Sequence, residues 1–194
     1  MKTALLVIDM QNGFCREDGS FSRAGFVLPN MDKIIAQNVA LIAAARAQDV
    51  PVIFTRHVLR PGKLDADTWL KNLPLEDASL QIGSWDADII TELAPESEDV
   101  VVDKNRFDAF LYTELETILR ALNVRNIVVS GVVTSVCVES TVRSGYQRGF
   151  DMFVASDATS ARGSFHDAAL DIMGTVFAQV GSGLDMLKKA ITGP

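Results

Sequence analysis

Short apolar segments alternate along this chain with longer segments that have helical periodicity. The apolar segments are nearly continuous and rich in β-branched residues, which is typical of parallel strands buried on both faces. We predict strands over residues 4–9, 51–56, 99–103, 126–131 and 152–155, and a short sixth strand over residues 178–180. The segment at the N-terminus resembles a signal sequence only in outline, because its apolar run soon reaches Asp9 and no small-residue cleavage site follows.

Helical patterns occupy the segments between these strands. After Pro29 and Asn30, apolar residues recur on one helical face, namely Met31, Ile34, Ile35, Leu41, Ile42 and Ala45. Thr113 and Glu116 have the spacing of a capping box, and Ser164 is placed to cap a third helix. This alternation predicts a single Rossmann-like α/β domain over residues 1–194, a three-layer α/β/α sandwich with a mostly parallel six-stranded sheet.

The segment from His57 to Pro95 breaks the alternation, because prolines and glycines interrupt it throughout. Ligands of open α/β sheets bind beyond the carboxyl ends of the strands, where such insertions lie. We therefore expect this segment to help form a binding site. A dinucleotide is not the expected ligand, because no G-x-G-x-x-G motif follows the first strand.

Composition narrows the set of partners. Hydrophobic residues make up 48% and charged residues 22% of the chain, an ordinary globular balance, and the net charge is −7. A phosphate-binding surface needs concentrated Lys and Arg, so nucleic acid is not an expected partner. No apolar run approaches the ~18 residues of a membrane span, so no membrane partner is expected. The two cysteines, Cys15 and Cys137, are expected to stay reduced, which favours a cytoplasmic location, and Cys15 has no predicted chemical role.

Three polar residues follow predicted parallel strands: Asp9, Lys104 and Cys137. Because the carboxyl ends of parallel strands meet at one edge of a sheet, we expect their side chains to converge. Thr134 and Ser135 are candidate helix caps, which would place Cys137 in the first helical turn. The N–H groups of that turn and the Lys104 ammonium would favour the thiolate, and Asp9 would accept the thiol proton. The same N–H groups would bind an oxyanion.

Four sequence blocks now point to a known family: Val7–Phe14 (VIDMQNGF), Val102–Phe110 (VDKNRFDAF), Ser130–Phe150 (SGVVTSVCVESTVRSGYQRGF) and Ser156–Thr159 (SDAT). On these blocks the chain resembles the isochorismatase-like cysteine hydrolases. That group includes nicotinamidase, N-carbamoylsarcosine amidase, ureidoacrylate amidohydrolase and biuret hydrolase. The similarity runs over nearly the whole length.

The resemblance implies a catalytic triad of Asp9, Lys104 and Cys137, and a sheet order of 3-2-1-4-5-6. It also implies a cis peptide bond between Val132 and Val133, with an oxyanion hole made by the amides of Val133 and Cys137. The implied reaction is thiolate attack on an amide carbonyl, loss of ammonia or an amine, and hydrolysis of the acyl-enzyme. The substrate would be a small amide or ureide, and the protein a homodimer or homotetramer.

Departures from the family pattern narrow the activity. Isochorismatases that cleave a vinyl ether lack the nucleophilic cysteine, so ether cleavage is not expected. Nicotinamidases carry an Asp-x-His metal motif after the second strand, whereas this chain has Thr55-Arg56-His57-Val58 there, and its other histidine is the distant His166. One histidine without a carboxylate or second histidine at ligand spacing does not make a metal site. We therefore predict no metal and no cofactor.

Substrate-binding residues are predicted from position. Arg56, His57 and Arg60 would line the approach and attract a substrate carboxylate, which an arginine can bind through two hydrogen bonds. Phe14, Trp85 and Phe107 would wall the pocket, Phe14 by the resemblance and Trp85 by its place in the insertion.

Three interpretations stay open at this point. The first is a metal-independent amidohydrolase acting through an acyl-cysteine, and the second is a nicotinamidase with a lost or rearranged metal site. The third is a catalytically silent scaffold of the same fold. Metal analysis and a nicotinamide assay separate the first two, and failure of iodoacetamide to label Cys137 would favour the third. Residue order does not identify the substrate.

Overall fold

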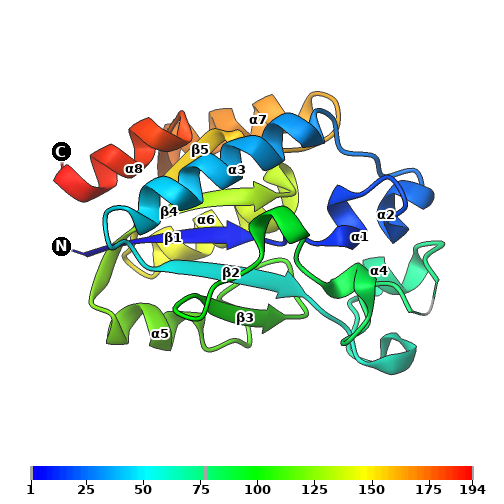
Figure 1. Ribbon diagram of the computed structural model, residues 1–194. Helices are drawn as coiled ribbons and strands as arrows, with labels where there is room; N and C mark the ends of the chain where they lie inside the picture. Colours follow the sequence, from blue (N-terminus) through cyan, green and yellow to red (C-terminus); the bar gives the residue numbers. More distant parts are fainter. Residues whose placement is uncertain (1, 77, 194) are drawn as a thin grey trace.

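The six strands form one sheet in which each neighbouring pair runs parallel. Their order is β3-β2-β1-β4-β5-β6, the order that the resemblance implied. The computed structural model describes residues 2–76 and 78–193 (Figure 1). The strands are β1 (Lys2–Ile8), β2 (Val52–His57), β3 (Val100–Lys104), β4 (Val124–Val132), β5 (Asp151–Ser160) and β6 (Ala178–Gly181). The predicted strands are confirmed, and the predicted three-layer α/β class with them.

Helices cover both faces of the sheet, so the strands are buried on both sides, as their continuous apolar runs predicted (Figure 1). Alternate residues of β1 show the division, since successive side chains of a strand point to opposite faces. Leu5 and Val7 pack with one group of helices, and Leu6 and Ile8 pack with the other. The first group is α3 (Met31–Arg46) and α8 (Gly183–Thr192), and the second is α5 (Leu115–Ala121), α6 (Glu139–Gln147) and α7 (Phe165–Ile172).

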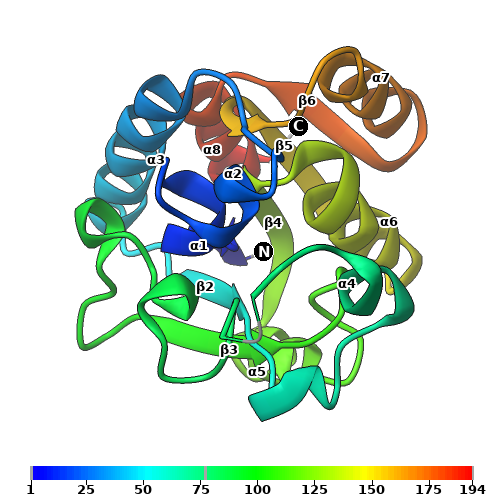
Figure 2. The same cartoon turned by 90° about the vertical axis from the view of Figure 1, so that its right-hand side faces the viewer.

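The chain leaves β1 toward β2 and β3 on one side and returns to build β4, β5 and β6 on the other. The carboxyl ends of β1 and β4 therefore flank a topological switch point, where ligands of such sheets bind. Three short helices gather at this end (Figure 1), and Figure 2 looks onto it. They are α1 (Asn12–Cys15), α2 (Ser20–Arg23) and α4 (Thr68–Asn72). The insertion between β2 and β3 supplies α4 and is otherwise irregular apart from short 3₁₀ turns, as expected.

Local capping differs from the sequence prediction. The Thr113–Glu116 capping box does not form, because the Glu116 carboxylate pairs with Arg120 and Arg148 instead. Ser164 is the residue before α7, as predicted, but its side chain makes no capping hydrogen bond. Ion pairs with these two arginines therefore take the place of the predicted cap at Glu116.

Sequence reasoning missed α8, the last helix. The Ser182 hydroxyl accepts a hydrogen bond from the Asp185 N–H and caps the helix. Met186, Leu187 and Ala190 then bury one face against the sheet. The sequence does contain a signal for this helix, namely a serine at the N-cap position followed by apolar residues at helical spacing.

Candidate active site

Asp9 stands at the carboxyl end of β1, in the middle of the sheet. Its backbone is left-handed (φ 51°), which turns the chain out of the strand at once. The neighbouring strand holds the side chain, because the Thr55 hydroxyl donates a hydrogen bond of 2.6 Å to Asp9 Oδ1. Asp9 is fully buried, so its carboxylate has a fixed position and no water to screen its charge.

Lys104 is the last residue of β3 and reaches the same carboxylate across the end of β2. Its Nζ lies 2.6 Å from Asp9 Oδ2 and also donates to the carbonyl oxygen of Arg106 at 3.0 Å. The two side chains are 0% and 1% exposed. Burial alone would lower the pKa of Lys104, but the Asp9 carboxylate, with a further contribution from Cys137, outweighs it, so the pKa lies above its ordinary value. The predicted meeting of Asp9 and Lys104 is observed, and the lysine stays charged.

Cys137 lies in a single π-helical turn, Thr134–Val138, that joins β4 to α6. The residue before the turn is Val133, and the peptide bond from Val132 to Val133 is cis. The predicted caps are wrong, since no side chain caps this turn. The Thr134 hydroxyl instead hydrogen-bonds Thr159 and His166.

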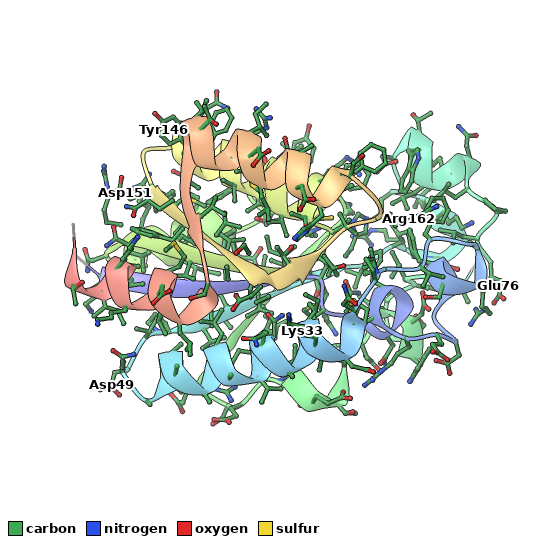
Figure 3. The ribbon with its side chains drawn as sticks, turned by 90° about the horizontal axis from the view of Figure 1, so that it is seen from above. Lys33, Asp49, Glu76, Tyr146, Asp151 and Arg162 are labelled. Carbon is green, nitrogen blue, oxygen red and sulfur yellow. The ribbon has the colours of Figure 1, made fainter. Side chains whose placement is uncertain are left out.

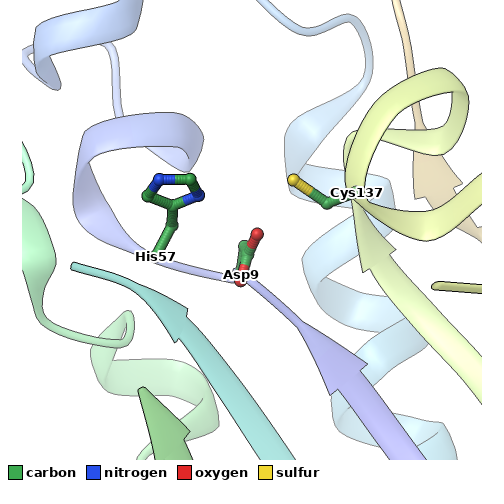
Figure 4. A group of neighbouring side chains, drawn as sticks. All are labelled: Asp9, His57 and Cys137. Carbon is green, nitrogen blue, oxygen red and sulfur yellow. The ribbon is translucent and has the colours of Figure 1, made fainter. Parts of the chain in front are cut away.

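The Cys137 sulfur faces the Asp9 carboxylate and the His57 ring, as Figure 4 shows. One polar atom of each of these three side chains lies within 4.8 Å of the others. Burial raises the pKa of the Cys137 thiol, Lys104 lowers it only in part, and Asp9 raises it again. These effects favour the thiol over the predicted thiolate, because burial and the Asp9 carboxylate both penalise a second negative charge at this position.

His57 is the site residue whose importance the sequence analysis underestimated. It ends β2, it is buried, and its Nε2 has no hydrogen-bond partner among the described residues. Burial, reinforced by the charges of Lys104 and Arg106, holds the pKa of His57 well below its usual range, so the ring is neutral. The sequence contained a signal for this position, since His57 is the last residue of a parallel strand, as Lys104 is.

A glutamine fixes the end of β2 beneath that ring. The His57 N–H donates to Gln11 Oε1 at 2.6 Å, and Gln11 Nε2 donates back to the His57 carbonyl oxygen at 3.0 Å. The same amide group donates to the Ala87 carbonyl oxygen at 2.9 Å, which ties the insertion to the strand ends. Gln11 therefore acts on the geometry of the site without facing the cavity.

The donor types of Asp9, His57 and Cys137 are those that bind transition metals. Within residues 2–76 and 78–193 they are the one group of three such side chains whose donor atoms come together. A cation there would compete with the Lys104 ammonium, which already pairs with Asp9 at 2.6 Å. The fit is poor for this reason, and the absence of a metal stays a prediction.

A cavity of about 470 Å³ opens in front of Cys137. Its size is in the range of small-molecule sites. Phe14 and Phe107 line it, as predicted, and so does Val133, the residue assigned to the oxyanion hole. The other lining residues are mainly apolar: Phe21, Phe26, Leu28, His57, Trp69, Leu70, Ser135, Val136, Arg162, Gly163 and Phe165.

Three residues predicted to bind substrate are not among those that line this cavity. Arg56 makes a two-point ion pair with Asp103 across the strands, with distances of 2.7 and 2.9 Å. Arg60 lies on a separate surface depression beside Asp65. The Trp85 ring is 49% exposed, and its carbonyl oxygen accepts a hydrogen bond from Asn12. Arg56 points away from the site because successive side chains of a strand point to opposite sides, and its neighbour His57 points into the site.

Two other residues, which the sequence analysis did not select, line the cavity instead of the predicted tryptophan and arginines. Trp69 lies on α4, and Arg162 lies in the loop between β5 and α7. Figure 3 labels Arg162 at the end of the molecule where the strands terminate. Folding brings α4 and this loop, which are distant in sequence, to Cys137, and no local sequence signal marks either residue. Cys15 is buried in the core near Phe14 and does not line the cavity.

Comparison with known proteins places this arrangement in a family. A family model described as the isochorismatase domain matches residues 3–183. The chain belongs to the isochorismatase family. The family predicted from the sequence is thereby confirmed, and with it the hydrolase class.

Relatives within the isochorismatase family match almost the full chain. The ureidoacrylate amidohydrolase RutB of Methylobacterium radiotolerans is 36% identical over 92% of this chain and 75% of its own. A cysteine hydrolase from Pseudomonas syringae pv. phaseolicola has 32% identity and a TM-score of 0.89, covering 98% of this chain and 93% of that one. The N-carbamoylsarcosine amidase of Thermoplasma acidophilum has 25% identity and a TM-score of 0.77, covering 94% of this chain and 97% of that one.

Among the helices of the described residues, none is both long and apolar enough to cross a bilayer.

Proposed function

We propose that this protein hydrolyses a C–N bond of a small amide, ureide or carbamoyl compound through a covalent acyl-cysteine. One observation carries the proposal: the Cys137 thiol faces the Asp9 carboxylate at the wall of a cavity, and the Lys104 ammonium is paired with that carboxylate. These are a nucleophile, a base and a positive charge in one buried place. The amidohydrolase activities named for the relatives support the same class of reaction.

In the first half of the reaction, Asp9 accepts the proton of the Cys137 thiol as the sulfur attacks the carbonyl carbon. The carbonyl oxygen becomes an oxyanion, and the N–H groups of Val133 and Cys137, residues that both line the cavity, bind it. Asp9 then gives its proton to the departing nitrogen, the C–N bond breaks, and ammonia or an amine leaves. The acyl group stays on the sulfur as a thioester.

In the second half, water attacks the thioester carbon while Asp9 accepts one of its protons. The C–S bond breaks, the acid product leaves, and the proton returns to the sulfur, so one water is consumed for each C–N bond cut. Lys104 stabilises the carboxylate form of Asp9 in both halves, because its Nζ stays 2.6 Å away. The neutral His57 ring, whose Nε2 has no hydrogen-bond partner among the described residues, would hydrogen-bond the substrate nitrogen or the attacking water.

An ammonia-release assay tests this proposal on a panel of primary amides, ureides and carbamates. We expect turnover by the wild type and a loss of at least about 10³-fold in kcat for Cys137→Ala. Cys15→Ala is the matched control, because this second thiol is buried away from the cavity, and it should retain activity. A slow substrate should add its acyl mass to Cys137 in intact-protein mass spectrometry. Undiminished turnover by Cys137→Ala would contradict the covalent mechanism.

Metal independence is part of the proposal and has its own test. Dialysis against EDTA should leave turnover unchanged, since the Lys104 ammonium occupies the place beside Asp9 that a cation would need. Loss of activity that zinc restores, together with turnover of nicotinamide, would favour the nicotinamidase-type alternative. The single domain over residues 1–194, the cytoplasmic location and the homo-oligomeric state predicted from the sequence remain proposals alongside it.

A further inference from the structure

Aromatic rings form an almost unbroken wall around the cavity, and the last ring of the series, His57, lies beside the nucleophile. Each ring contacts the next, with centroid separations between 4.5 and 6.1 Å. In order, the rings are Phe14, Phe21, Phe26, Trp69, Phe107 and His57. A wall of this kind favours apolar or planar groups and offers few partners to a polar chain. An apolar group therefore matches this wall better than a polar one does.

The mouth leaves large apolar surfaces in contact with water. Trp69 is 46% exposed and Phe165 is 66% exposed, and both line the cavity. Large exposed apolar side chains that line one cavity mark a place where a ligand or partner binds. A ligand body that covers these rings would gain the free energy of their burial, whereas a compact ureide seated at Cys137 would leave them exposed.

The charge at the mouth of the cavity is positive and comes from an arginine. Among the described lining residues, Arg162 is the one that carries a charge, since the cavity histidine is neutral. The Arg162 guanidinium lies 5.4 Å from the centre of the Phe26 ring, which orients it along the wall. It makes no ion pair with any carboxylate in the part of the chain that the structure covers. Its donors are available to an anion at the mouth.

We propose that the substrate of this site is an amphipathic anionic amide, with its scissile C–N group at Cys137, an apolar body along the aromatic wall, and a carboxylate that Arg162 binds at the mouth. This inference rests on the proposed hydrolysis and adds the substrate class. Arg162 is then a specificity-determining residue, because it contacts the end of the substrate farthest from the reacting atoms. Guanidinium and carboxylate groups match in geometry, so two parallel hydrogen bonds hold that end.

A series of three amides with the same leaving group tests the class. Butanamide carries only the scissile amide on a short chain. 4-Phenylbutanamide adds a phenyl ring as the apolar body, and 4-(4-carboxyphenyl)butanamide adds a carboxylate to that ring. Burial of the ring should raise kcat/KM at least about tenfold. The carboxylate should raise it about three- to tenfold more, and this second gain should shrink with added salt, since Arg162 is exposed. Equal kcat/KM for the two neutral amides, or no gain from the carboxylate, would overturn the proposal.

Two matched variants locate the effects. Arg162→Gln should remove the gain from the carboxylate and keep the gain from the ring. Arg60→Gln removes an arginine that lies outside the cavity and should keep both. In the same way, Trp69→Leu should reduce the gain from the ring, and Trp85→Leu should not. An equal loss on neutral and anionic amides in Arg162→Gln would contradict the assigned role of Arg162.

Binding separates failure of this inference from failure of the proposed reaction. Calorimetry on Cys137→Ala with the same three amides needs no turnover. The order of affinities should follow the order of the series, and Arg162→Gln in that background should weaken the anionic amide alone. If the affinities follow this order but the wild type turns over none of the three amides, the proposed hydrolysis is wrong and the proposed ligand class stands. If the wild type turns the amides over but the affinities do not follow this order, the proposed ligand class is wrong and the proposed hydrolysis stands.

Discussion

The Lys104 ammonium neutralises the buried Asp9 carboxylate and lowers the pKa of the Cys137 thiol. In Lys104→Met the carboxylate is left buried without its partner, which we expect to cost about 3–5 kcal/mol in the free energy of unfolding. The sulfur should also become less reactive, since its pKa rises further. Urea denaturation and the rate of iodoacetamide labelling at Cys137 measure the two effects.

Arg125→Met is the control for that substitution, because it breaks the exposed ion pair with Asp151 at 2.9 Å. Water screens such a pair, so stability should hardly change. If Lys104→Met were as stable as Arg125→Met, the buried pair would not be the structural element described above.

His57 predicts how stability depends on pH. Its pKa is lowered in the folded protein, so between the ordinary value of 6.5 and the folded value the unfolded chain binds more protons than the folded one. The stabilising contribution is fully present above pH 6.5 and is lost as the pH falls toward the folded pKa. The slope approaches about 1.4 kcal/mol per pH unit for one proton.

His57→Gln should flatten that slope between pH 6.5 and 5.5 in urea denaturation, while His166→Gln should retain it. His166 is the other histidine of the chain and lies at a different cavity, hydrogen-bonded to Thr134. An unchanged slope in His57→Gln would show that other groups cause the acid sensitivity.

At the scale of elements, the approach of β4 to β1 decides whether the site residues meet. Gly131 sits in β4 opposite Ile8, with φ +97°, and a Cβ there would lie 2.0 Å from the Ile8 carbonyl oxygen. Backbone cannot move aside as a flexible side chain does, so Gly131→Ala must push the two strands apart. Asp9 follows Ile8 directly and Val133 comes two residues after Gly131, so both would be displaced.

We expect Gly131→Ala to lose activity and to unfold at a much lower temperature than the wild type. Gly149→Ala provides the comparison, because Gly149 also has a positive φ (+82°) but a Cβ there meets no atom within 4 Å. That variant should show only the cost of the left-handed backbone, about 1–2 kcal/mol. Calorimetric melting and ammonia release test the pair, and similar melting temperatures would argue against the close strand contact.

Several elements were predictable because their signals are local. The continuous apolar runs predicted six strands, and residues at their ends led to Asp9, Lys104 and Cys137. The Glu116 cap failed because two arginines take its carboxylate, Arg120 one helical turn away and Arg148 distant in sequence. Trp69 and Arg162 were missed because the insertion that carries α4 and the loop between β5 and α7 follow no periodicity that would predict their paths to the cavity.

At the scale of the whole molecule, the resemblance predicts a homo-oligomer. We expect sedimentation analysis to give twice or four times the 21.1 kDa mass of the chain. The mass should persist in high salt if apolar burial dominates the contacts between subunits, because salt screens exposed ion pairs but not apolar burial. A single species at the mass of one chain would remove the oligomer from the proposal.

The amino-acid sequence by itself determined the layers of this protein, the order of its chemistry-bearing residues and its family. Those properties follow from apolar periodicity and from short motifs, which act between neighbours along the chain. Only the tertiary structure decided that burial raises the pKa of the Cys137 thiol, that His57 faces it with a neutral ring, and that Arg162 rather than Arg56 stands at the mouth. Burial and electrostatic fields sum over atoms that folding brings together from distant segments, so residue order alone does not contain their values.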